Sequence, residues 1–492
     1  ATALTLTNLF YCFVGVLLGT LIGVLPGIGP LATIAMLLPI TYQFADPTTA
    51  LIMLAGIYYG AQYGGSTTAI LVNLPGEVSS VVTVLDGYQM ARQGRPGPAL
   101  AIAAIGSFFA GTVATVLVAA FAPVLAEVAF EFGPAEYFSL MVLGLIAAVV
   151  LAHGSVLKAL AMVVFGLLIG MVGTDVNSGV ARFSFDIPEL TDGIELAAIA
   201  MGIFGFGEII ANLEQGAQRE VFTRKIGRLL PSGSELRASA APIVRGTALG
   251  SFLGLLPGGG AVLSSFTSYA LEKKLSRTPE RFGKGAIEGV AGPESANNAG
   301  AQTSFIPMLT LGIPTTPTMA LMIGAMMIHN IQPGPQVMTG NPTLFWGLIT
   351  SMWIGNLMLV ILNLPLIGIW IRLLTVPYRL LYPAILLFCC IGAYSINNNV
   401  FDVYVTLPFA VLGYVFRKLD CEPAPLLLGL VLGSLMEEYL RRAMTISRGD
   451  WSVFVTRPLS ATLLAIAAVL LVIVFMPAIA KKRDEAFAEE ET

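Results

Sequence analysis

Long stretches without a charged residue constrain this chain more than any other feature. Residues 1–45 and 295–371 contain no Asp, Glu, Lys or Arg. The apolar runs at 99–126, 343–371 and 461–480 are each long enough to cross roughly 30 Å of hydrocarbon as a helix. Charged residues make up only 11% of the 492 residues, too few to cover a soluble protein of this size. The sequence therefore predicts an all-α integral membrane protein.

The charges between the apolar runs predict how the chain crosses the membrane. Cytoplasmic loops are rich in Lys and Arg, as are the segments around residues 92–95, 214–239 and 272–285, whereas 127–136 and 174–195 are acidic and are expected outside. The predicted spans are 99–126, 137–152, 158–173, 196–213, 343–371, 380–396, 403–416, 424–440 and 459–480. With those nearer the N-terminus, a polytopic bundle of about 12 transmembrane helices is expected. The basic tail at 481–483 is expected in the cytoplasm. The mixed charges of 437–457 assign that segment neither to the cytoplasmic side nor to the external side.

An internal repeat divides the chain. Residues 19–29 match residues 250–260 at an offset of 231, with six of eleven positions identical. A second match in the same order relates the Gly-Ala-Gln at 60–62, followed by Leu-Pro at 74–75, to the Gly-Ala-Gln at 300–302, followed by Ile-Pro at 313–314. The loops that follow the matched segments have opposite charge patterns in the two halves. We therefore predict two inverted repeats, 1–230 and 231–458, and a final span and tail at 459–492. This architecture is typical of secondary transporters, with substrate held at the repeat interface.

Pro and Gly interrupt the matched segments at membrane depth. The runs at 25–30 (LPGIGP) and 256–260 (LPGGG) cannot stay helical, and each leaves a helix N-terminus with free N–H groups that attract a carboxylate. The alternative is a packing kink between closely crossing helices. Hydroxyl and amide residues follow both runs. The predicted substrate-binding residues are Gly27, Gly29, Ser66, Thr67, Thr68, Asn73, Gly258, Gly260, Thr315 and Thr316.

Two acidic residues adjoin these polar segments. Glu77 and Glu294 are functional candidates because carboxylates are rare in membrane spans; the alternative is a carboxylate at the membrane edge, paired with a loop cation. The predicted coupling residues are Asn297, Asn298, Gln302, Glu77 and Glu294. A Na⁺ site is expected at Asn297, Asn298, Thr310 and Gly312, whose neutral oxygens suit that ion. A coupling proton would instead need Glu77 or Glu294. The excess of neutral oxygens favours Na⁺.

Several function classes have no motif here. The sequence contains no GxxxxGK[ST] phosphate loop and no GxSxG elbow, and its two histidines are far apart. The four cysteines form no CxxC pair, and no basic, aromatic-rich stretch suggests nucleic-acid binding. Neither an enzyme nor a bound cofactor is expected.

The interrupted segments resemble a known family. Residues 23–30 (GVLPGIGP), 59–77 (YGAQYGGSTTAILVNLPGE), 292–302 (GPESANNAGAQ) and 307–330 are similar to the large membrane subunit of tripartite tricarboxylate transporters, the TctA family. The resemblance implies two partners, a small four-helix membrane subunit (TctB-like) and a periplasmic solute-binding protein (TctC-like). It also implies uptake of di- and tricarboxylates such as citrate across the bacterial inner membrane, driven by an ion gradient. An elevator mechanism follows only by analogy with related carboxylate transporters. The alternative function is a channel or a membrane scaffold without its own substrate site.

Overall fold

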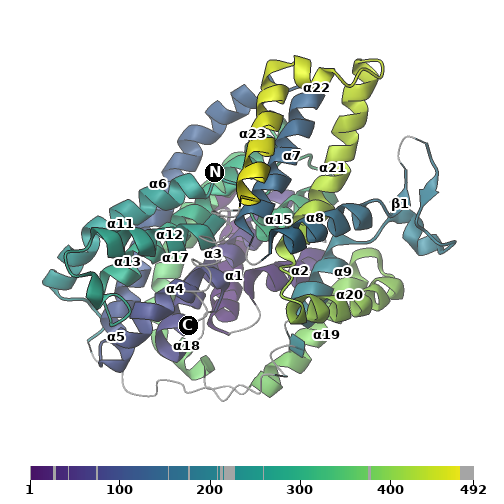
Figure 1. The fold of residues 1–492 in the computed structure, drawn as a ribbon. Helices are drawn as coiled ribbons and strands as arrows, with labels where there is room; N and C mark the ends of the chain where they lie inside the picture. The colour runs from purple at the N-terminus through teal and green to yellow at the C-terminus, as the bar shows by residue number, and fades with distance from the viewer. Residues whose placement is uncertain are drawn as a thin grey trace.

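A computed structural model describes residues 2–25, 29–42, 44–73, 76–152, 155–175, 178–207, 209–210, 214, 228–258, 260–374 and 378–476. Within these ranges the chain is almost entirely helical (Figure 1). The prediction of an all-α membrane protein is confirmed at this level. The helices α1, α6, α17 and α20 are each long and apolar enough to cross a bilayer, and further apolar helices are shorter.

The elements of the first part of the chain are α1 (Leu6–Val24), α2 (Gly29–Tyr42), α3 (Pro47–Val72), η2 (Val78–Ser80), α4 (Val81–Thr83), η3 (Val84–Tyr88), α5 (Gln89–Arg92), α6 (Pro96–Ala129), α7 (Pro134–Leu151), α8 (Val156–Gly170), β1 (Gly173–Thr174), β2 (Ala181–Arg182), α9 (Leu196–Ala200) and η5 (Met201–Phe206). Those of the second part are α11 (Gly233–Leu253), α12 (Gly260–Leu275), α13 (Glu288–Thr303), α14 (Phe305–Leu311), α15 (Pro317–Ile328), α16 (Gln336–Gly340), α17 (Pro342–Asn363), α18 (Ile367–Leu374), α19 (Tyr378–Asn397), α20 (Val400–Lys418), α21 (Ala424–Ile446), α22 (Val453–Thr456) and α23 (Pro458–Val474).

Within the described residues, each span predicted between residue 99 and residue 480 coincides with one of these helices, apart from two. The run at 196–213 is a five-residue helix, α9, followed directly by the π-helix η5, which ends at Phe206. The other exception is the run at 343–371. That run is divided, because α17 ends at Asn363 and the short helix α18 begins at Ile367. Pro365 lies between them and has no N–H to continue the helical hydrogen bonds. Trp370 of α18 folds back and donates its indole N–H to the carbonyl of Leu362 at 2.8 Å. The predicted span is therefore a membrane helix followed by a separate amphipathic turn.

Two completely buried helices form the centre of the molecule. Every residue of α3 after its first is buried, and so is every residue of α13 after its first. Helix α13 packs against α11, α12 and α6, while α3 packs against α1, α17 and α6. In Figure 1, α11 and α12 run alongside α13. A buried helix surrounded on all sides is normally apolar, so the polar residues of α13 are unusual.

Glycines let matched helix pairs approach closely in both halves. A Cβ added at Gly19 of α1 would overlap the backbone of Ile57 in α3, and one added at Gly250 of α11 would overlap the backbone of Ala296 in α13. The same holds for the glycines four residues on either side, which are 15 and 23 in α1, 246 in α11 and 254 directly after α11. Small residues at a spacing of four are a standard means of packing membrane helices. The offset of 231 between the glycines is the offset of the sequence repeat, while the division into inverted repeats stays a prediction.

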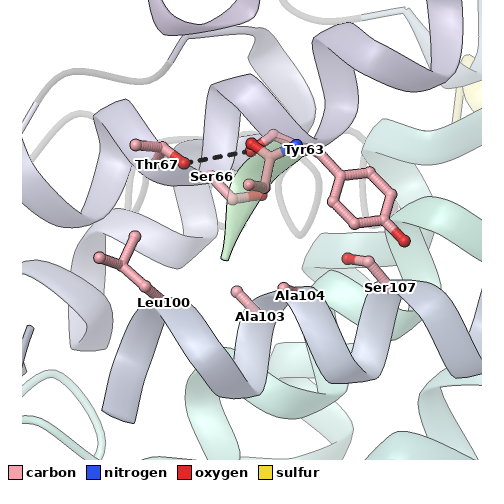
Figure 2. Close-up of a pocket in the computed structure, with 8 residues that line it drawn as sticks. Tyr63, Ser66, Thr67, Leu100, Ala103, Ala104 and Ser107 are labelled. Carbon is pink, nitrogen blue, oxygen red and sulfur yellow. Dashed lines mark hydrogen bonds between the residues drawn. The ribbon is translucent and has the colours of Figure 1, made fainter. Parts of the chain in front are cut away.

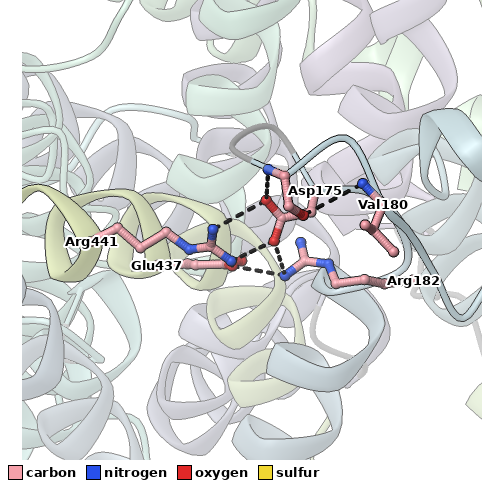
Figure 3. A network of polar contacts seen from close by, with 6 residues as sticks. Asp175, Val180, Arg182, Glu437 and Arg441 are labelled. Atoms are coloured by element: carbon pink, nitrogen blue, oxygen red, sulfur yellow. Dashed lines mark hydrogen bonds and ion pairs between the residues drawn. The ribbon is translucent and has the colours of Figure 1, made fainter.

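A separate group of helices, α7, α8, α21 and α23, packs beside this centre (Figure 1). Charged side chains attach the β1–β2 hairpin to it (Figure 3). Arg441 of α21 donates to Asp175 at 2.5 and 3.1 Å and to Glu437 at 2.5 Å, and Arg182 donates to Glu437 at 2.7 Å. The mixed charges of 437–457 therefore belong partly to a helix that continues to Ile446. The charged side chains of Glu437 and Arg441 hold the β1–β2 hairpin against α21.

Candidate functional site

Both predicted interruptions of the first matched segment are present. Helix α1 ends at Val24 and α2 begins at Gly29, with Gly29 at φ +61°; Gly27 lies outside the described residues. Helix α11 ends at Leu253 and α12 begins at Gly260, with Gly258 at φ +78° and Gly260 at φ +44°. Positive φ is the region that favours glycine. The two halves therefore use glycine in the same way to restart a helix.

The second matched segment is also interrupted alike in both halves. Asn73 ends α3 at φ 62°, ψ 25°, and Gly312 ends α14 at φ 68°, ψ 24°, both left-handed. Four residues later the chain is extended again, at φ −148°, ψ 165° for Glu77 and φ −139°, ψ 161° for Thr316. These residues precede the short helix η2 and the longer helix α15. One half thus begins its next element with a carboxylate and the other with a hydroxyl.

The polar runs that precede these interruptions are helical. Ser66, Thr67 and Thr68 lie inside α3, and residues 297–302 lie inside α13. The neutral oxygens that this segment offers near Asn297 are therefore those of its side chains, because its main-chain carbonyls lie within a helix. Thr68 donates to the carbonyl of Val24 at 2.9 Å, beside the first interruption.

The carboxylate of Glu294 joins the two halves of the chain. It is completely buried in α13 and accepts hydrogen bonds from Ser66 of α3, at 2.5 Å, and from Thr83 of α4. Thr83 has no motif around it, and only its fold position reveals its role. Among the described residues, no Lys, Arg or His nitrogen lies within 4.0 Å of Glu294 or Glu77. Two carboxylates thus lie near the centre without a cationic side chain.

Glu77 lies in a second polar group beside the first. Its carboxylate contacts the hydroxyl of Ser79, which also lies 3.0 Å from the side-chain oxygen of Gln62. The Asn297 side chain lies close to the Glu77 carboxyl, and Glu294 is near enough to interact with it electrostatically. The Ser79 hydroxyl has one proton for these two oxygens, so it cannot donate to both of them at once.

Several buried polar atoms of the site have no hydrogen-bond partner within the described residues. These atoms are both side-chain amide atoms of Asn297, the side-chain oxygen of Gln302 and the hydroxyl of Thr315. Each of these residues is at most 3% exposed. Unpaired buried polar groups are costly and rare in native structures, so these atoms indicate a place for a ligand, an ion or water.

The remaining predicted residues are not all part of this group. Asn298 donates to Ser107 at 2.7 Å and to the Glu294 carbonyl at 3.0 Å, which supports α13 against α6. The Thr310 hydroxyl donates to the carbonyl of Ile306 in its own helix, and Gly312 approaches Pro333. Thr310 and Gly312 therefore share no hydrogen-bond partner with Asn297 in this conformation.

A small cavity lies between α3 and α6 (Figure 2). Its volume is about 10 Å³, room for about one water molecule. Residues from α3, α6 and the end of α17 line it: Tyr63, Ser66, Thr67, Leu100, Ala103, Ala104, Ser107 and Asn363. The α6 residues and Asn363 have no sequence signal, because they look like ordinary members of apolar spans. The cavity is too small for a carboxylate, so this conformation leaves no room for one in the space between α3 and α6.

Comparison with known proteins identifies the family. The sequence model described as the tripartite tricarboxylate transporter TctA family matches residues 9–428. Two proteins of Agrobacterium vitis are each 63% identical to the chain. One, "Uncharacterized 52.8 kDa protein in TAR-I ttuC' 3'region", aligns over 490 residues, 100% of this chain and 97% of its own length. The other, "Uncharacterized protein in TAR-II ttuC' 3'region", aligns over 242 residues, 49% of this chain and 100% of its own length.

No solved structure matches the chain. The family match covers most of the residues, including both interrupted segments and all of α3 and α13. It confirms the resemblance expected from the motifs at 23–30, 59–77 and 292–302. The chain belongs to the tripartite tricarboxylate transporter TctA family.

Proposed function

We propose that this chain is the large membrane subunit that carries di- or tricarboxylates such as citrate across the bacterial inner membrane, driven by a cation gradient. One observation carries the proposal: a polar layer between α3 and α13 holds the buried carboxylate of Glu294, the half-buried carboxylate of Glu77 and several unpaired polar atoms, in a molecule otherwise suited to lipid. Such a layer is expensive in a membrane protein unless it handles a polar ligand.

The substrate is an anion, and its positive counterpart comes from the backbone. Residues 295–371 contain no Lys or Arg. Helix N-termini, with their free N–H groups and partial positive charge, take that role at the interruptions. This is the usual position for substrate in transporters built from discontinuous helices.

The coupling ion offsets the charge of the substrate. Each negative charge moved into a negative interior costs roughly 2.3 kcal/mol per 100 mV, so a di- or trianion needs several cations. We favour Na⁺, held by the side-chain oxygens of Asn297, Glu77 and Glu294. The alternative is a proton on one of the two carboxylates. Both account for two carboxylates, one buried and one half-buried, that have no cationic neighbour within the described residues.

The partners follow from the family. A TctC-like periplasmic binding protein delivers the carboxylate, and a small TctB-like membrane subunit completes the carrier. Because the closed cavity holds about one water, the halves of the site must move apart during transport. An elevator-like displacement of one body relative to the other is the movement we propose.

Uptake by proteoliposomes containing all three components tests this function. Labelled citrate should accumulate under an inward Na⁺ gradient and fail to accumulate when choline replaces Na⁺ at fixed pH. Citrate that equilibrates without accumulating would indicate a channel. Full uptake by vesicles that lack this chain would indicate a scaffold. Full uptake in choline, abolished by Glu294→Gln, would identify a proton symporter instead.

A further inference from the structure

We infer that the site is divided by charge along α13, with a cation subsite around Glu77 and Glu294 and the subsite for a substrate carboxylate at the second-half interruption, around Gly258, Gly260 and Thr315. This inference rests on the proposed function and assigns its two ligands to different places. It differs from the expectation of two equivalent interruptions, because the matched positions carry opposite chemistry.

The first argument compares the two residues that precede the helices after the second matched segment. These are Glu77 before η2 and Thr316 before α15. Glu77 and Thr316 have nearly the same backbone conformation. The carboxylate of Glu77 repels a substrate carboxylate, whereas a hydroxyl can donate a hydrogen bond to one. Two interruptions of similar geometry therefore attract ions of opposite sign.

The second argument is the inventory of donors in the first half. The hydroxyls of Ser66 and Thr83 donate to Glu294, and that of Thr68 donates to Val24. These hydroxyls are already occupied by protein oxygens. What remains is an excess of oxygens from Glu77, Glu294 and Gln62, which is the coordination that a hard cation prefers.

The third argument is the inventory of the second half, where donors remain available. The 16-residue helix α12 begins at Gly260. The main-chain N–H of Gly258 is not one of the available donors, because it donates to the carbonyl of Thr315 at 2.8 Å; this bond holds the residues before α12 against those before α15. Gly260 also lies against the Thr316 side chain, which precedes the N-terminus of α15. Two helix N-termini therefore come together there. The hydroxyl of Thr315, fully buried between them, has no partner within the described residues.

No carboxylate is near this second interruption along the chain. Residues 236–271 and 295–401 contain neither Asp nor Glu. In space the nearest acidic residue is Glu77, because η2, which follows it, packs against α12. An anion at this interruption therefore needs the cation bound at Glu77 to offset that carboxylate.

The two subsites are close enough to affect one another. Gly300 of α13 lies against Gly260 and is six residues from Glu294, roughly 9 Å along the helix axis. Two unit charges at that separation, with an effective dielectric constant near 20, change each other's affinity by about 20-fold. A cation at Glu294 should therefore tighten carboxylate binding by this factor, and reciprocally.

Ligand-induced stabilisation of the purified full chain tests the division. Thermal unfolding is followed during NaCl titration, with choline chloride keeping the ionic strength constant, and during citrate titration with and without Na⁺. Thr315→Val should weaken citrate binding about tenfold or more, because a hydrogen bond to a charged group is lost, and should leave Na⁺ binding unchanged. Thr247→Val is the matched control, since it removes a buried hydroxyl that bonds to the carbonyl of Ile243 within its own helix.

Glu294→Gln should abolish the response to Na⁺ and make citrate affinity independent of Na⁺. Its matched control is Glu288→Gln, at the start of the same helix, where the carboxylate pairs with Arg281. A wild-type response to pH in place of Na⁺, lost in Glu294→Gln, also supports the division and identifies the cation as a proton.

The division is overturned if Thr315→Val weakens Na⁺ binding and spares citrate, or if Glu294→Gln weakens citrate binding equally with and without Na⁺. A failure of the proposed function looks different. In that case the wild-type chain neither responds to citrate nor accumulates it in the three-component vesicles, and both proposals fall together.

Discussion

Replacing Gly19 or Gly250 with Ala tests the packing that positions the site. A Cβ at Gly19 would lie 2.8 Å from both the carbonyl carbon and the Cα of Ile57, and one at Gly250 would lie 2.7 Å from the Cα of Ala296. Ordinary contact begins at 3.4 Å, so the backbones must separate by at least 3.4 − 2.8 = 0.6 Å and 3.4 − 2.7 = 0.7 Å. No side-chain rotation can relieve a contact between backbone atoms.

The cost follows from two opposing effects. Overpacking a tight contact costs about 1–3 kcal/mol, and a clash with backbone belongs at the upper end. Alanine recovers about 1 kcal/mol through its better helix propensity. Each substitution should therefore destabilise the fold by about 2 kcal/mol. Because the two sites lie in different helix pairs, the double variant should lose about twice as much.

Unfolding of the purified chain in detergent measures this loss. Gly368→Ala is the matched control, because nothing lies within 4 Å of its Cβ in α18; it should be neutral or slightly stabilising. Citrate uptake should fall together with stability. The reason is that α1 ends at the interruption at 25–30 in the first half, and α11 ends at the matching interruption at 256–260 in the second half. If Gly19→Ala and Gly250→Ala unfold as the control does, close backbone packing does not hold these helices together.

Three further predictions concern the ends of the helices. Asp86 accepts the main-chain N–H groups of residues 285 and 286, each at 2.7 Å; Asp86→Ala should cost about 3 kcal/mol or more in unfolding free energy, because charged acceptors are strong. The main-chain N–H of Ser232 lowers the pKa of Glu235 to about 2. Stability from its ionised form should thus be complete above pH 4.5 and lost as the pH falls toward 2, so the defect of Glu235→Gln should shrink over that window in unfolding measurements. Cysteines at positions Ser276 and Thr339 should react with membrane-impermeant reagent from opposite sides, and labelling from one side would refute the inverted arrangement.

Membrane spans and their interruptions could be predicted from the sequence because both depend on local chemistry. An uncharged apolar run of sufficient length has few alternatives to a buried helix. The restart of α12 at Gly260 requires positive φ and the absence of a continuing hydrogen bond, which Pro257 and the glycines supply. The run at 343–371 also contains a proline, Pro365, which predicts a break in the helix because it has no N–H. Hydropathy obscured it because apolar residues continue on both sides.

Helix boundaries next to charged residues were harder to predict. Hydropathy alone ends the helix α21 near residue 440, where charges accumulate. In the structure it continues to Ile446. Glu437 pairs with Arg441 at 2.5 Å, four residues along the same helix. Such pairs stabilise exposed helical turns, so the charges extend the helix beyond the apolar part that hydropathy recognises.

The pairing of groups at the site depends on the packing of distant helices, which no local pattern contains. Helical spacing already places Gln62 with Ser66 on one face of α3, and Glu294 with Asn298 on one face of α13. It does not say that these faces meet, because Ser66 and Glu294 are 228 residues apart. Thr83 is harder still, since a single hydroxyl in a short turn has no periodicity. The matched glycines supply the missing constraint: they fix the contacts of α1 with α3 and of α11 with α13. Helix α6 packs against both α3 and α13, so it places their polar faces next to each other, where the buried carboxylate of Glu294 accepts from Ser66.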